Sequence, residues 1–202
     1  MVFAILFVAL VWIDQVTKLL AYATDVSHVV IIPGFLEIDK MSNPLTNDLN
    51  TGMSFGIASD EPWAIPLFIA VTCIALVVFL IALIKLPAKK RFLRLSIAFI
   101  MAGAAGNLID RIVLGGVRDF IYMDFSFIGI SPFWNNVADL VITAGAIMFI
   151  LALLFVDDDA LFRFGKKKER EELEKAAAQL PEGTAAVGSD VGEGAEEPHK
   201  EE

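Results

Sequence analysis

The chain has 202 residues, of which 56% are hydrophobic, and a formal net charge of −9. Its mean hydropathy of +0.66 is too high for an ordinary soluble domain and indicates an integral membrane protein. The negative charge comes mostly from residues 169–202, and no basic stripe indicates a nucleic-acid partner. A single cysteine, Cys73, excludes an internal disulfide. With only two histidines, His28 and His199, we expect no metal site built on His and Cys.

Four apolar segments are each long enough to cross a bilayer, which takes about 20 residues. In chain order they cover residues 2–22, 63–84, about 92–112 and about 133–156. The first segment has no basic start and is interrupted by charged residues, so we interpret it as a membrane helix rather than a cleaved signal peptide. The predicted fold is an all-α integral membrane protein with four transmembrane helices.

Basic residues predict the orientation of these helices, because cytoplasmic loops carry an excess of lysine and arginine. Residues 85–94 contain five basic side chains, and residues 163–170 contain another five. We therefore expect both stretches and both termini in the cytoplasm. The connections at 23–62 and 113–132 are then expected outside.

The first outer connection has the composition of a small sheet. Residues 29–32 are Val-Val-Ile-Ile, a Pro-Gly pair follows, and residues 35–38 are again mostly apolar, which is typical of two short strands around a turn. Together with the four helices, this predicts a membrane domain over residues 1–156 with a small extracytoplasmic β-sheet. Residues 157–202 are expected to form a charged, largely disordered cytoplasmic tail.

Polar side chains gather at one expected depth of the membrane domain. Asp14, Asp110, Arg111, Asp119 and Asp139 all fall at or near its outer face. A carboxylate near hydrocarbon is costly, so its presence indicates a function. Two carboxylates held together can share one proton, as they do in aspartic proteases. Asp119 and Asp139 are therefore a candidate catalytic pair.

Several of these polar residues also have a structural interpretation. Asp14 and Lys18 are four residues apart and can form an ion pair within one helix. Asn107, Asp110 and Arg111 share one helical face, just after small residues that permit close helix packing. Asp110 is expected to be a structural partner, whereas the donors of Asn107 and Arg111 suit either a substrate carbonyl or the protein itself.

Asp139 has a structural alternative of its own. Asn135, Asn136 or Asp139 could cap the start of the fourth helix. Because 17 uncharged residues follow Asp139, we expect it to lie inside the helix rather than at the cap.

Three other functions compete with a paired-aspartate enzyme. A proton-coupled transporter would place polar groups at mid-depth and on the inner side as well. A non-enzymatic four-span scaffold would not need two aspartates at matched depth. A serine–lysine protease would have to use the loop residues Ser54, Ser59 and Lys40, which stand in no motif.

Five short motifs follow one another in order over about residues 1–156. They are Asp14-Gln-Val-Thr-Lys18, Asn50-Thr-Gly-Met-Ser-Phe55, Gly106-Asn107-Leu-Ile-Asp110-Arg111, Val117-Arg-Asp119-Phe120 and Asn136-Val-Ala-Asp139. Together they resemble the motifs of the lipoprotein signal peptidase family, also called signal peptidase II. Arg118 stands where such enzymes usually have an apolar residue.

The resemblance implies a bacterial inner-membrane aspartic endopeptidase that needs no cofactor. Such an enzyme removes the signal peptide of a prolipoprotein, cutting before a cysteine that already carries diacylglycerol. The implied partners are this lipid-modified prolipoprotein and membrane lipids, and we expect a monomer. The implied site comprises the catalytic pair Asp119 and Asp139, the substrate-binding residues Asn50, Asn107, Arg111 and Asn136, and the polar supports Asp14, Lys18 and Asp110.

Overall fold

The computed structural model describes residues 2–23, 28–41, 48–52 and 61–156. All of them belong to one compact unit, Met1–Leu161. Several sequence-based expectations lie outside the described residues. These are the tail at 157–202 with its basic cluster at 163–170, and the serines Ser54 and Ser59.

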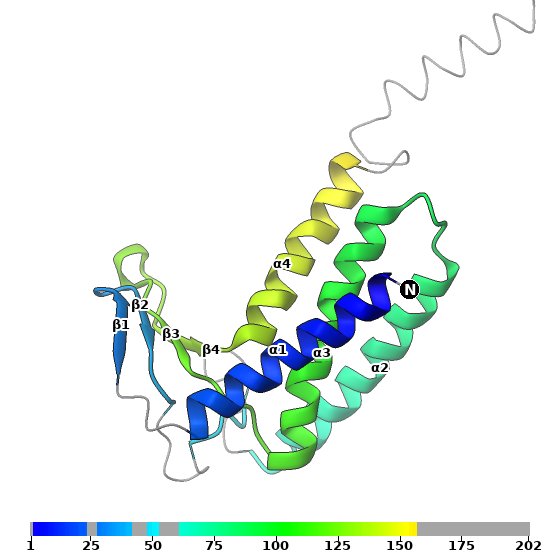
Figure 1. Cartoon of the computed structure of the whole chain (residues 1–202). Coiled ribbons are helices and arrows are strands. Elements are labelled where there is room, and N and C mark those ends of the chain that lie inside the picture. The colour runs from blue at the N-terminus through cyan, green and yellow to red at the C-terminus, as the bar shows by residue number, and fades with distance from the viewer. Residues whose placement is uncertain (1, 24–27, 42–47, 53–60, 157–202) are drawn as a thin grey trace, which may run out of the picture. The chain divides into compact units, whose positions relative to one another are not determined.

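Four long helices make up the membrane part of the chain (Figure 1). Each is long and apolar enough to cross a membrane, which confirms the four predicted spans. Most large apolar side chains of the first two helices are exposed, as expected for surfaces that face lipid rather than water. The helices are α1 (Val2–Ala23), α2 (Ala64–Lys85), α3 (Arg91–Leu114) and α4 (Val137–Leu151), the last continuing as the π-helical turn η3 (Ala152–Val156).

Helix α3 is central, because it contacts α1, α2 and α4. Glycines permit its closest contact, which is with α4. A Cβ atom added at Gly103 would collide with the backbone oxygen of Ala138, and one at Gly145 would collide with Ile100. The predicted close approach at these small residues is therefore confirmed.

A four-stranded antiparallel sheet accompanies the helices, in the order β1-β2-β3-β4. The first two strands are the predicted pair, joined by a turn in which Gly34 has a φ of +70°. The other two were not predicted. In particular, residues 133–135 were assigned to the fourth helix, but they pair with β3 as a strand, and the helix begins only at Val137. The strands are β1 (Val29–Ile32), β2 (Leu36–Ile38), β3 (Ile121–Met123) and β4 (Phe133–Asn135).

The sheet lies beside the end of α1 and the start of α4 (Figure 1). Here an extended stretch at 117–120 leads from α3 into β3, and backbone hydrogen bonds tie it to three other segments. Asn50 exchanges two bonds of 2.8 Å with Val117, Met41 N–H donates to the Asp119 carbonyl, and Phe120 N–H donates to the Asn135 carbonyl. Segments that are far apart in the sequence therefore meet at this stretch.

Candidate active site

Asp119 lies in this extended stretch and is only 2% exposed. Two side-chain amides hold its carboxylate. The Asn136 Nδ2 donates to Oδ1 at 2.6 Å, and the Asn50 Nδ2 donates to Oδ2 at 2.8 Å. The backbone pairing of Asn50 with Val117 fixes the second of these amides beside the carboxylate. Each carboxylate oxygen thus has a neutral donor, as a buried charged group requires.

Asp139 lies in the first turn of α4 and is partly buried. Its backbone N–H donates to the Asn136 Oδ1 at 3.1 Å, and its carboxylate accepts from the Asn136 backbone N–H at 3.1 Å. This reciprocal pair caps the helix. Asp139 lies inside the helix, as predicted, and also takes part in the capping interaction. Since the Asn136 side chain binds Asp119 as well, one residue contacts both carboxylates.

Asn107 of α3 connects Asp139 to α1. Its Nδ2 donates to the Asp139 Oδ1 at 2.7 Å, and its Oδ1 accepts from the Lys18 Nζ at 2.8 Å. A lysine ammonium can only donate, so Lys18 determines which way the Asn107 amide is turned. Lys18 is fully buried and forms the predicted ion pair with Asp14 at 2.9 Å.

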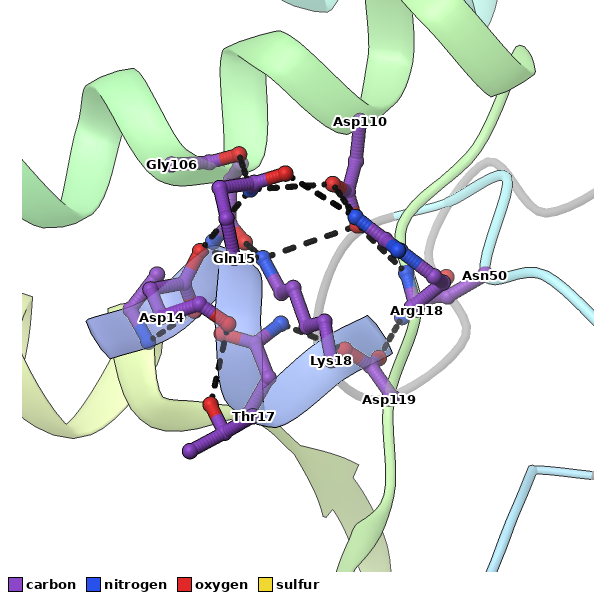
Figure 2. Close-up of polar contacts among 12 residues, drawn as sticks. Asp14, Gln15, Thr17, Lys18, Asn50, Gly106, Asp110, Arg118 and Asp119 are labelled. Carbon is purple, nitrogen blue, oxygen red and sulfur yellow. Dashed lines mark hydrogen bonds and ion pairs between the residues drawn. The ribbon is translucent and has the colours of Figure 1, made fainter. Parts of the chain in front are cut away.

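Asp14 and Asp110 form a buried charged cluster with Lys18 (Figure 2). The Asp14 Oδ1 accepts from the Ala138 backbone N–H at 2.8 Å, which attaches α1 to the first turn of α4. Asp110 lies 3.6 Å from the Lys18 Nζ and is fully buried. The structure therefore brings together the predicted support residues and the two candidate aspartates.

Three residues of this region were missed by sequence reasoning. Gln15 donates to carboxylates of both Asp14 and Asp110, and Arg118 pairs with Asp110 at 2.7 Å. The Tyr22 hydroxyl lies 3.1 Å from the Asp119 carbonyl oxygen. Gln15 and Arg118 stood inside the recognised motifs, so their positions were a signal. Tyr22 gave none, because its partners are 26 and 97 residues away.

Arg111 lies at the edge of this site. Its Nη2 is 3.5 Å from the Gly52 carbonyl oxygen, and its guanidinium carbon lies 5.3 Å from the centre of the Phe68 ring. Its Nε is buried and has no hydrogen-bond partner within the described part of the chain. The side chain thus links α2, α3 and the loop at 48–52, and its guanidinium keeps donor capacity.

The electrostatics suit a carboxylate that exchanges protons near neutral pH. Burial, followed by the charge of the nearby Asp139, raises the pKa of Asp119 to about 6. Among residues 2–23, 28–41, 48–52 and 61–156, no three His, Cys, Asp or Glu side chains are grouped to hold a metal ion. Asp139 lies close enough for its charge to act on Asp119, so the arrangement can hold two acidic groups next to each other, which is what acid–base catalysis on water needs.

Several known proteins are similar to this chain. The lipoprotein signal peptidase of Symbiobacterium thermophilum is 33% identical over 158 residues, covering 76% of this chain and 94% of its own length. That of Staphylococcus haemolyticus is 35% identical over 149 residues, covering 73% of this chain and 87% of its own length.

A solved structure described as a bacterial membrane enzyme has 32% identity and a TM-score of 0.62, and the match covers 76% of this chain and 87% of that one. The family model described as Signal peptidase (SPase) II matches residues 6–155. The chain therefore belongs to the signal peptidase II family.

Proposed function

We propose that this protein is a membrane aspartic endopeptidase that removes signal peptides from prolipoproteins, with Asp119 and Asp139 as its catalytic residues. One observation carries the assignment of the pair: Asn136 binds both carboxylates, although they come from different segments. The lipoprotein signal peptidase of Symbiobacterium thermophilum, 94% of which is covered by the match, supports the substrate class. Membership of this family does not favour the transporter or the scaffold.

The two carboxylates would act as one acid–base unit. One takes a proton from a water molecule, whose oxygen attacks the carbonyl carbon of the scissile peptide bond. The other carboxyl group donates its proton to the carbonyl oxygen, which gives a tetrahedral intermediate. When the C–N bond breaks, the first carboxyl group passes its proton to the leaving amine, while the second takes a proton from a hydroxyl of the intermediate as the new carboxyl product forms. The pair then holds one proton again. No step of this scheme uses a metal or an organic cofactor.

The amides and Arg111 supply orientation in this scheme. Asn50, Asn107 and Asn136 hold the carboxylates from fixed directions. The Arg111 Nε has no partner among the residues that the structure describes, and a peptide carbonyl of the substrate would satisfy it. This unused donor supports the predicted substrate-binding role of Arg111, whereas the same role for Asn50, Asn107 and Asn136 stays a prediction.

The location of the pair fits a substrate anchored by lipid. Asp119 lies between α3 and β3, and Asp139 lies in the first turn of α4. The sheet lies beside this end of α1 and α4 (Figure 1). We place this end at the outer face, from the basic connection between α2 and α3 at the opposite end. A diacylglyceryl-modified cysteine could then keep its acyl chains in the bilayer while the preceding peptide bond reaches the pair.

The test is cleavage of a defined substrate by the purified protein in lipid. A prolipoprotein that carries diacylglyceryl-cysteine should be cut immediately before that cysteine, as mass spectrometry of both products would show. The same precursor without the lipid should remain intact. No cleavage of the lipidated precursor, or undiminished cleavage by a variant that lacks both aspartates, would contradict the proposal.

A further inference from the structure

Arg118 is the residue before Asp119, and its side chain is committed to a buried carboxylate (Figure 2). Its Nε and Nη2 donate to the two oxygens of Asp110 at 3.1 and 2.7 Å, and its backbone N–H donates to the same carboxylate at 3.0 Å. Nη2 also donates to the Gln15 Oε1 at 2.9 Å. Such a two-pronged contact fixes direction as well as distance.

Arg118 also balances the charges of the buried cluster. Asp14 and Asp110 are two buried carboxylates, and Lys18 is one buried ammonium. Lys18 lies closer to Asp14, at 2.9 Å, than to Asp110, at 3.6 Å. The arginine supplies the second positive charge, and so each carboxylate has its own cation. An unpaired buried charge would be costly.

The charge balance of this cluster also affects Asp139, through Lys18. The Lys18 Nζ donates to the Asn107 Oδ1 at 2.8 Å, and the Asn107 Nδ2 donates to Asp139 at 2.7 Å. If Asp110 lost its arginine, it would draw Lys18 away from Asn107. The amide that holds Asp139 would then lose the contact that orients it.

The Arg118 side chain also affects the position of Asp119, through the backbone that joins the two residues. Successive side chains of an extended stretch point in opposite directions. Arg118 is held against α1 and α3 on one side, while Asn50 and Asn136 hold the Asp119 carboxylate on the other. The peptide between residues 118 and 119 is thus clamped from both sides.

We propose that Arg118 is a positioning residue for the cleavage reaction, which orients Asp119 through the backbone and Asp139 through Lys18 and Asn107. The inference rests on the proposed function. Arg118 would affect the reaction although its side chain binds Gln15 and Asp110 rather than either catalytic aspartate.

The surrounding charges make this testable by pH dependence. The hydrogen-bonded Asp110 raises the pKa of Arg118, so the guanidinium stays charged at any working pH. Neutralising it removes one positive charge near the pair, which favours the protonated form of the carboxylates. The charged and titratable groups that face this region are Asp14, Lys18 and Tyr22 of α1, Asp110 and Arg111 of α3, Asp139 of α4, and Asp48.

The experiment compares Arg118→Gln, Arg118→Lys and the double variant Arg118→Gln/Asp110→Asn. Arg91→Gln is the matched control, since it removes an exposed arginine at the opposite end of α3. Cleavage of the lipidated precursor is followed across pH, and membrane insertion and thermal unfolding are measured for every variant. Wild-type protein and Asp119→Asn are measured alongside.

Arg118→Gln should lower kcat about tenfold or more with little change in KM, and should move the basic limb of kcat/KM, where the pair loses its shared proton, up by about half a pH unit. Arg118→Lys should lower kcat but keep the limb in place, because the charge remains. The double variant should recover most of the lost kcat, because no buried charge is left unpaired. Arg91→Gln should behave as wild type.

A folded Arg118→Gln variant with wild-type kcat and an unmoved limb would overturn the inference. So would a double variant as impaired as the single one. If Arg118→Gln does not fold, the other two variants test the inference. A pH limb that is displaced in Arg118→Lys would contradict the inference, and so would a double variant that is folded but inactive. If the wild-type protein does not cleave the lipidated precursor, both the proposed function and the role of Arg118 are wrong. If Asp119→Asn abolishes cleavage but the Arg118 variants cleave as wild type does, only the role of Arg118 is wrong.

Discussion

Asn50 and Asn136 show how a buried carboxylate can be held without losing its ability to take up a proton. Both donate to Asp119, and neither carries a charge. A cation in the same place would favour the ionised form far more strongly. With amide donors, burial and the Asp139 charge prevail, and the pKa of Asp119 rises to about 6.

The rate of cleavage should therefore fall as the pH is raised through about 6. Above this pH Asp119 loses the proton that the pair shares, because the charge of Asp139 contributes to that pKa, and no carboxyl group is left to donate to the carbonyl oxygen. Asn50→Ala should move this basic limb to higher pH, because the hydrogen bond favours the charged form of Asp119 and its loss raises the pKa. The measurement is kcat/KM against pH.

Asp124→Asn serves as the control, because that carboxylate lies after β3 and accepts a hydrogen bond from the nearby Ser126 N–H. Its limb should coincide with that of wild type. A limb that stays in place in Asn50→Ala, or moves to lower pH, would remove Asn50 from the environment of Asp119.

At this scale the sequence indicated both aspartates and most of the side chains that surround them, but not the contacts of Tyr22 and Arg118. Asp119 and Asp139 were found because carboxylates at matched depth are costly and stood in recognisable motifs. The Tyr22 contact could not be found, because its partner Asp119 is 97 residues away and depends on the completed fold. The pairing of Arg118 with Asp110 was hidden for a different reason: it depends on the turn between α3 and the extended stretch.

At the scale of elements, the site depends on how closely α3 packs on α4. Asn107 on α3 must come within hydrogen-bond distance of Asp139 on α4, and Gly103 of α3 permits the helices to approach this closely. A Cβ added at Gly103 would collide with the backbone of Ala138, the residue just before Asp139. Packing and catalysis are therefore linked at the first turn of α4.

Gly103→Val should lower both stability and activity. Overpacking a close contact costs about 1–3 kcal/mol, and here relief of the collision would move the turn that carries Asp139. Thermal unfolding in detergent and the cleavage rate would be measured together. Ala104→Val places the same side chain at a partly exposed neighbouring position and should have little effect on either.

Equal stability of the two valine variants would show that α3 and α4 are not in close contact at Gly103. Normal activity in a destabilised Gly103→Val variant would separate helix packing from the placement of Asp139.

The helices were more predictable than the strands because a membrane span needs about 20 apolar residues, which is a strong signal. The first hairpin was marked by its Pro-Gly turn. Strands β3 and β4 have only three residues each, and the apolar Phe133 and Trp134 looked like the start of the fourth span. Capping by Asn136, a local polar interaction, is what begins the helix later.

For the whole molecule, the charge asymmetry predicts orientation. The connection between α2 and α3 belongs to the basic stretch at 85–94, and the sheet lies at the opposite end of the helices. In a Cys73→Ala background, a cysteine introduced at Ser126 should react with an impermeant thiol reagent added outside intact cells. One introduced at Lys89 should react only after the membrane is opened.

Both positions are exposed, so accessibility within the protein does not distinguish them. The reverse labelling pattern would place the aspartates at the cytoplasmic face, and a substrate processed at the outer face could not reach them.

The proposed mechanism depends above all on the carboxylates of Asp119 and Asp139 acting as a unit. The most direct measurement is the cleavage rate of lipidated prolipoprotein by Asp119→Asn, Asp139→Asn and the control Asp124→Asn, each shown to insert and fold. Each of the first two should lose nearly all activity, and the control should keep it, because only the first two remove half of a shared-proton pair. If either variant kept more than about a tenth of the wild-type rate, roughly 1.4 kcal/mol of barrier, that aspartate would not be catalytic.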